Sequence, residues 1–192
     1  MRHRVTIIPI AVAALAALGA STAIADGKGH DNVRTFPTTL SGYNETPSTI
    51  NSTGSGEFVA KVNNDESSVS YALTYRDLGT PVIQAHIHFG RPSLNGGVVL
   101  FLCNTSGSPP ATVPTPPPCP QGGGTVTGTL TAADVIAVAG QGIDPGAAGF
   151  AEMIKALRNG AAYANVHTQL RPGGEIRGPL GKAPDNDEDD DD

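Results

Sequence analysis

Two histidines in the chain stand at a spacing that suits metal chemistry. His86 and His88 lie two residues apart in the segment QAHIHFG, residues 84–90, within an apolar run that favours a β-strand. On a strand, residues two apart point to the same side of the sheet and lie roughly 6.5 to 7 Å apart along the chain. The two imidazoles should therefore face one side together, while Ala85 and Ile87 face the other.

A third imidazole is available at His167, in the β-like segment AYANVHT. Neutral imidazoles bind Cu(II), Zn(II) or Ni(II), and three of them leave one coordination position open for water or a small ligand. Glu45 or Glu175 would complete such a shell or orient a ring from outside it. We therefore predict a copper or zinc site at the three histidines. The alternative is that the rings only form hydrogen bonds with backbone carbonyls.

The elements that must position these rings are mainly strands. From Phe36 onward, short runs with alternating apolar residues are separated by Gly, Asn, Asp and Pro, which is typical of antiparallel strands and tight turns. The pattern predicts a mostly β fold, an antiparallel Greek-key-like sandwich or barrel of about eight strands. The expected strands lie around 38–43, 56–63, 68–75, 81–89, 96–103, 123–130, 161–169 and 174–180.

Two segments in the C-terminal half predict helices instead. TAADVIAV, residues 131–138, begins like a capping box, with Thr131 as N-cap and Asp134 three residues later. Residues 146–160 space their apolar side chains at helical intervals and end at Gly160. We expect a short and a longer helix over one end of the fold. The RPGG turn, with positive φ expected at Gly173, should pair the His167 strand with the 174–180 strand.

The ends of the chain differ from this β-rich body. Residues 1–25 resemble a secretory signal peptide, with Arg2 and Arg4 before an apolar run and a cleavage site at Ala25. Residues 26–35 are expected to be a flexible N-terminus, 36–181 the folded domain and 182–192 a disordered acidic tail. We expect a secreted, periplasmic or cell-surface protein. The apolar run is short for a bilayer, so no membrane span is expected.

Charge and cysteine content narrow the partners further. Seven of the 18 acidic residues lie in 185–192, and the rest of the chain carries no basic patch, which argues against nucleic-acid binding. Cys103 and Cys119 flank a proline-rich loop in a chain expected to be exported, so we predict a disulfide that closes this loop. The sequence does not reveal which protein or matrix partner, if any, the chain binds.

Several motifs together resemble the CHRD domain, the module named after chordin. They are LSGYNETP, GSGEFVAKVN, YALTYRDL, AHIHFG with NGGVVLFL, GTVTGTL with TAADV, and AYANVHTQLRPGGEIRGPL, and they span about residues 40–180. The resemblance implies a secreted or surface β-sandwich module. The cysteine-bounded proline insertion between Leu102 and Gly122 departs from the family pattern.

A shorter resemblance bears on chemistry. AHIHFG is similar to the HxH strand of Cu/Zn superoxide dismutases, and NVHT to the later histidine of their copper site. By this likeness, Arg177 would lie near the metal as an anion-guiding arginine. The bridging histidine and the zinc ligands have no counterparts in the chain.

Three functions follow as hypotheses. The first is a non-enzymatic, exported binding module with a three-histidine copper or zinc site, acting in metal handling or surface adhesion. The second is a copper-dependent redox enzyme that resembles superoxide dismutase. The third is a structural or adhesive surface module without metal.

Overall fold

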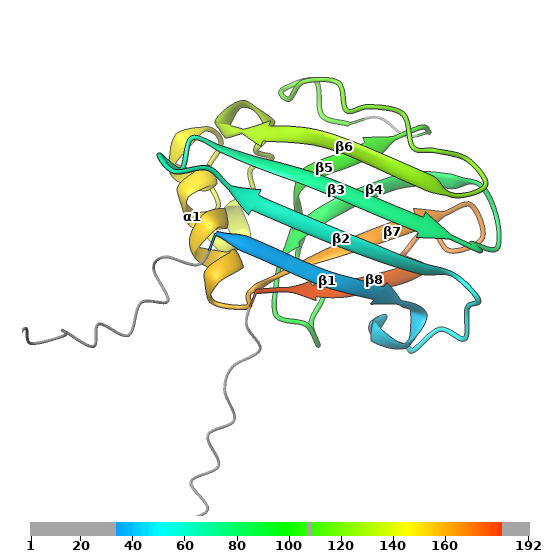
Figure 1. Ribbon diagram of the computed structural model, residues 1–192. Helices are drawn as coiled ribbons and strands as arrows, with labels where there is room; N and C mark the ends of the chain where they lie inside the picture. Colours follow the sequence, from blue (N-terminus) through cyan, green and yellow to red (C-terminus); the bar gives the residue numbers. More distant parts are fainter. Residues whose placement is uncertain (1–33, 107–108, 182–192) are drawn as a thin grey trace, which may run out of the picture.

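The computed structural model describes residues 34–106 and 109–181 and shows one eight-stranded antiparallel sheet curled into a nearly closed barrel (Figure 1). The strand order around the sheet is β5-β4-β7-β8-β1-β2-β3-β6. This confirms the predicted fold class. The strands are β1 (Thr35–Ser41), β2 (Ser55–Val62), β3 (Ser68–Arg76), β4 (Val82–Phe89), β5 (Gly97–Asn104), β6 (Gly124–Thr131), β7 (Ala162–Thr168) and β8 (Ile176–Leu180).

The barrel interior is built by the alternation seen in the sequence. Along β2 and β3 every second residue is buried, and Phe58 pairs with Leu73 across the two strands. Because side chains alternate between the two faces of a strand, this pattern sends one apolar set into a common core. Ala85 and Ile87 of β4 join the same core, as predicted.

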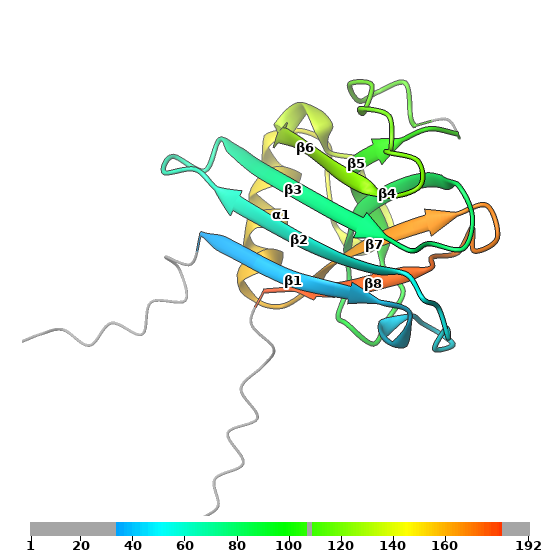
Figure 2. The same cartoon turned by 45° about the vertical axis from the view of Figure 1, so that its right-hand side comes forward.

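The barrel closes where the two edge strands, β5 and β6, lie side by side (Figure 2). Two other segments form backbone hydrogen bonds with the edge of β5. The Asn104 amide donates to the Pro117 carbonyl, and the Ile136 amide donates to the Val99 carbonyl. The predicted disulfide between Cys103 and Cys119 is present and ties the proline-rich loop to β5. These contacts satisfy backbone groups that an open edge would leave unpaired.

The predicted longer helix is α1 (Ala147–Arg158), which lies across one end of the barrel (Figure 1). The predicted helix over 131–138 is wrong. Thr131 and Asp134 do form a capping box, but they cap only a single 3-10 turn, Ala132–Asp134. Val135 then becomes extended, and the chain pairs with β5 through Ile136. None of the described helices is long and apolar enough to cross a membrane.

The predicted hairpin between β7 and β8 is confirmed, with Val166 paired to Ile176. Its turn differs in detail, because the positive φ belongs to Gly174, at 129°, and not to Gly173. The Gly174 amide donates to the Arg171 carbonyl and closes the turn. The predicted signal peptide, nearly all of the predicted flexible N-terminus and all of the predicted acidic tail lie outside the described residues.

Candidate metal site

The outer face of two neighbouring strands, β4 and β7, brings the three histidines together. Because Ala85 and Ile87 point into the core, the alternation sends His86 and His88 to the outer side of β4. In the register of β4 with β7, His86 faces Asn165 and His88 faces Tyr163. His167 lies two residues beyond Asn165 on the same face of β7.

All three histidines are buried although they face away from the core. The exposed fractions are 2% for His86, 7% for His88 and 6% for His167. Loops after the strands cover them, since residues 96 and 172 both contact an imidazole. Burial on the outer face is therefore produced by loops and not by the barrel interior.

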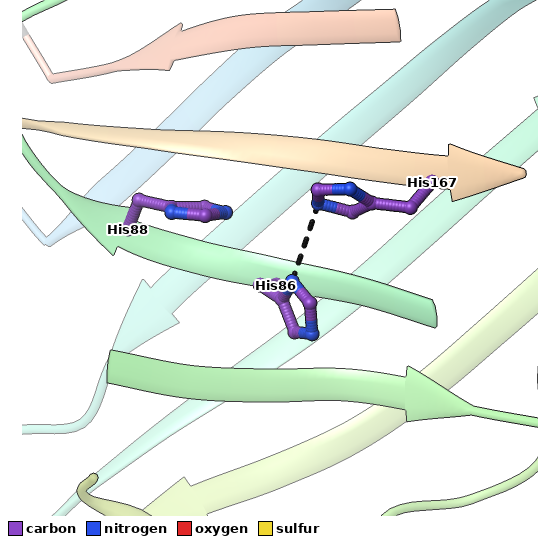
Figure 3. Close-up of side chains that lie close together, drawn as sticks. All are labelled: His86, His88 and His167. Atoms are coloured by element: carbon purple, nitrogen blue, oxygen red, sulfur yellow. Dashed lines mark hydrogen bonds between the residues drawn. The ribbon is translucent and has the colours of Figure 1, made fainter. Parts of the chain in front are cut away.

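The imidazoles converge on a common point. The rings of His88 and His167 extend toward each other from β4 and β7, and His86 lies beside the gap (Figure 3). One nitrogen from each ring lies within 4.8 Å of the other two. Three atoms at this separation have a common point that lies within about 2.8 Å of each of them. A metal–nitrogen bond is about 2.0 Å long. A small inward movement of the rings would therefore bring them to bonding distance.

Backbone carbonyls select which nitrogens are available to a metal. The Nδ1–H of His88 donates to the Gly96 carbonyl and that of His167 donates to the Pro172 carbonyl, each at 3.0 Å. A carbonyl only accepts hydrogen bonds, so the proton of each neutral ring is on Nδ1 and the lone pair is on Nε2. Such outer hydrogen bonds commonly orient the histidines of metal sites.

The ring of His86 contacts the lone pair of His167. His86 Nδ1 lies 3.3 Å from His167 Nε2, and with the proton of His167 on Nδ1, His86 must be the donor. Within the described part of the chain, Nε2 of His86 and Nε2 of His88 are buried without a hydrogen-bond partner. A metal ion would take the place of the His86 proton and satisfy the His88 lone pair.

The rings are neutral, which is the form that binds metal. Burial lowers the pKa of His88 from 6.5 to about 4; the hydrogen bond to the Gly96 carbonyl acts in the opposite direction, whereas the neighbouring His167 and Arg177 lower the pKa further. Burial also lowers the pKa of His86 to about 2 and lowers the pKa of His167. Protons therefore compete little with a metal ion at neutral pH.

A ring of contacts fixes the position of His88. Its imidazole stacks on Tyr163, with the ring centroids 4.6 Å apart, and the Arg177 guanidinium lies 3.3 Å from the centre of the same tyrosine ring. The Tyr163 hydroxyl accepts a hydrogen bond from the Gly96 amide, whose carbonyl holds His88. Gly96 must be glycine, because a Cβ there would clash with the Phe89 carbonyl.

Arg177 holds the covering loop in place. Its guanidinium donates to the carbonyls of Arg91 and Leu94 and to the side chains of Thr46 and Asn95. Two loops, one after β1 and one between β4 and β5, are thus joined over β7 and β8. Arg177, which we predicted to lie near the metal, and His88 both contact the Tyr163 ring, and the Arg177 donors are directed at these loop groups.

The two predicted carboxylates have other partners. Glu45 accepts a hydrogen bond from Asn165, the residue opposite His86. Glu175 accepts hydrogen bonds from Thr168, Ser52 and the Gly79 amide. Among the described residues, the group of potential metal ligands contains only the three histidines.

Several residues that shape the site were not predicted from the sequence: Gly96, Tyr163, Asn165 and Pro172. Strand alternation would have found Tyr163 and Asn165, since they lie four and two residues before His167. The two carbonyls on loops carry no such signal, because any residue type supplies the same group.

Comparison with protein families identifies the class. The family model of the CHRD domain matches residues 36–180, so the chain belongs to the CHRD domain family. The match extends from the second residue of β1 to the end of β8 and includes all three histidines. Comparisons with curated proteins and with solved structures found no match.

Proposed function

We propose that this chain is an exported, non-enzymatic CHRD binding module that holds one transition-metal ion, copper or zinc, at His86, His88 and His167. The observation that carries the proposal is the meeting of three buried, neutral imidazoles with one nitrogen each within 4.8 Å of the others. Three nitrogen ligands with one open position are a common arrangement for these metals.

The alternative of a metal-free packing role explains less of the geometry. Hydrogen bonds to carbonyls account for one nitrogen each of His88 and His167. They leave two buried nitrogens, Nε2 of His86 and of His88, without a partner among the described residues. A buried polar atom left unpaired costs about 1–3 kcal/mol. A metal ion bound to the cluster relieves part of this cost.

The enzymatic alternative receives less support from the contacts of Arg177. An anion-guiding role needs a guanidinium directed at an approaching substrate, whereas Arg177 donates to two carbonyls and two loop side chains. These contacts support a structural role for Arg177 in holding the loops over the site.

Export is supported by two features. The chain belongs to the CHRD family, and Cys103 and Cys119 form a disulfide. Disulfides persist mainly in oxidising compartments outside the cytosol. Sequencing the N-terminus of protein recovered from the medium or periplasm tests the proposed cleavage after Ala25; an N-terminus at Met1 would contradict it.

Equilibrium dialysis tests metal binding. Protein purified without a histidine tag is dialysed against zinc, and against copper with and without a reductant, and bound metal is counted per chain. We expect one ion more in the native protein than in His86→Ala/His88→Ala. The control is Thr127→Ala/Thr129→Ala, which changes two residues on the outer face of β6 and should bind like the native protein. Equal uptake by the native protein and the histidine variant would contradict the proposal.

A further inference from the structure

The electrostatic surroundings of the three histidines bear on which ion the cluster takes. This inference rests on the proposed metal site and concerns the charge of its ion. All three ligands are neutral, and the outer partners of His88 and His167 are backbone carbonyls rather than carboxylates. No negative charge is thus bonded directly to these rings, although carboxylates often orient histidines in zinc sites.

The nearest fixed charge on the His88 side is positive. The Arg177 guanidinium lies over the Tyr163 ring on which His88 stacks. Arg177 is 2% exposed, so solvent screens its charge little. A cation at this position repels a divalent ion more strongly than a monovalent one, in proportion to the charge of the ion.

The two nearby carboxylates are hydrogen-bonded to groups other than the imidazoles. Glu45 interacts with the charge of Arg177, and burial raises the pKa of Glu45. Its Oε1 accepts a hydrogen bond from Asn165. Glu175 accepts three hydrogen bonds, from Thr168, Ser52 and the Gly79 amide. The hydrogen bonds that these two carboxylates accept come from groups other than the imidazoles, so the three ligands receive no negative charge by direct contact.

Burying an ion in such a site costs more for a higher charge. The cost of moving an ion from water into a low-dielectric interior rises with the square of its charge, so a divalent ion pays about four times as much as a monovalent ion of the same size. Three imidazoles with exposed fractions of 2–7% provide no anion to offset this cost. A monovalent ion is the better match to these surroundings.

We propose that the cluster of His86, His88 and His167 selects monovalent copper, Cu(I), over Cu(II) and Zn(II). Imidazole is a ligand for copper, and a site of three nitrogens without an added anion suits an ion that carries a single charge. The preference comes from the neutral ligands, the burial and the Arg177 charge together.

Competition titrations test the selectivity. The purified protein is titrated anaerobically with Cu(I) against a Cu(I)-specific chelator, and separately with Cu(II) and with Zn(II) against chelators for those ions. We expect binding of Cu(I) to be at least about 100-fold tighter than that of Cu(II). By the relation of about 59 mV per tenfold for one electron, bound copper should then have a reduction potential about 120 mV above that of the free ion.

A matched pair of variants tests the electrostatic cause. Phe101 lies beside the cluster, with its ring 4.3 Å from that of His86, and it is partly exposed. Phe101→Glu adds a carboxylate, and Phe101→Gln adds a side chain of the same size without charge. We expect the ratio of Cu(I) to Cu(II) affinity to be at least tenfold lower in Phe101→Glu than in Phe101→Gln. Equal ratios in the two variants would overturn the electrostatic explanation.

The outcomes separate this inference from the proposed function. Binding of Cu(II) or Zn(II) that equals or exceeds that of Cu(I) overturns the selectivity and leaves the metal site in place. If the affinity for every ion is unchanged in His86→Ala/His88→Ala, both proposals are overturned, because the ions would then be bound by groups that this variant keeps, such as the acidic residues 185–192.

Discussion

The outer faces of β7 and β3 obey the same alternation but differ in what lies over them. Every residue of β7 is buried, whereas three outward residues of β3, Ser70, Thr74 and Arg76, are exposed. A hydroxyl in solvent finds water as a partner, but an imidazole that loops remove from water must be bonded within the protein. The loops over β7 therefore turn an ordinary polar face into a place where unpaired nitrogens favour a metal ion.

The largest expected effect comes from breaking the cover over β7. Arg177→Met removes the donors to Arg91 and Leu94 and leaves Glu45 without its cation, so the free energy of unfolding should fall by about 3–5 kcal/mol. Chemical denaturation measures this loss. The control is Lys61→Met on the exposed outer face of β2, which should change stability by less than about 0.5 kcal/mol. Similar losses in both variants would show that the two faces do not differ.

Removing the disulfide should destabilise the β5 edge of the barrel without affecting metal binding. Cys103 and Cys119 are 16 residues apart, so Cys103→Ser/Cys119→Ser should lower the free energy of unfolding by about 3 kcal/mol. The number of metal ions bound per folded chain should stay as in the native protein. A loss of bound metal from the folded variant would mean that the histidine site depends on the disulfide at the β5 edge.

Acidification should destabilise the buried histidine face selectively. The unfolded chain protonates His88 near its ordinary pKa of 6.5, whereas the folded chain does so only near 4. Between pH 6.5 and about pH 4 the unfolded state binds more protons than the folded state. The stability of the fold with a neutral His88 is therefore complete above pH 6.5 and decreases as the pH falls through this range. The loss is up to about 1.4 kcal/mol per pH unit for this group.

A variant isolates the contribution of this histidine. His88→Phe keeps a ring against Tyr163 and cannot be protonated, so from pH 7 to pH 5 the metal-free variant should lose about 2 kcal/mol less than the native protein. Denaturation curves at a series of pH values provide the comparison. Parallel pH profiles for the two proteins would contradict the buried, neutral state of His88.

The smallest expected effect distinguishes two buried tyrosines. Tyr163→Phe removes the acceptor for the Gly96 amide, and Tyr75→Phe removes the donor to the Pro120 carbonyl. Each should cost about 1 kcal/mol of stability. Only Tyr163→Phe should also weaken metal binding, by about tenfold, because Gly96 orients His88. Equal metal affinity in both variants would show that the Gly96 contact does not position the imidazole.

The sequence predicted the parts that depend on strand periodicity. Residues two apart on a strand share a face, so the spacing alone placed His86 and His88 on one side of β4. The same alternation placed Ala85 and Ile87 on the other side, toward the core. The β7–β8 hairpin brought His167 to the same sheet. What spacing did not reveal was the burial of this outer face, because burial depends on how loops far apart in sequence close over it.

The errors have local physical causes. The capping box at Thr131 predicted a helix, but after one turn the backbone pairs with β5, and the hydrogen bond from Ile136 to Val99 replaces a helical one. Tertiary pairing thus outweighed local propensity. The carbonyls of Gly96 and Pro172 were not predicted because a backbone group has no residue type to search for.

X-ray absorption of the copper-loaded protein tests the central claim most directly, because it counts the atoms bound to the metal. We predict a first shell of three nitrogens at about 2.0 Å with the outer scattering of imidazole rings, and loss of that signal in His86→Ala/His88→Ala. A shell of oxygens alone, or the same spectrum in the native protein and the variant, would contradict it.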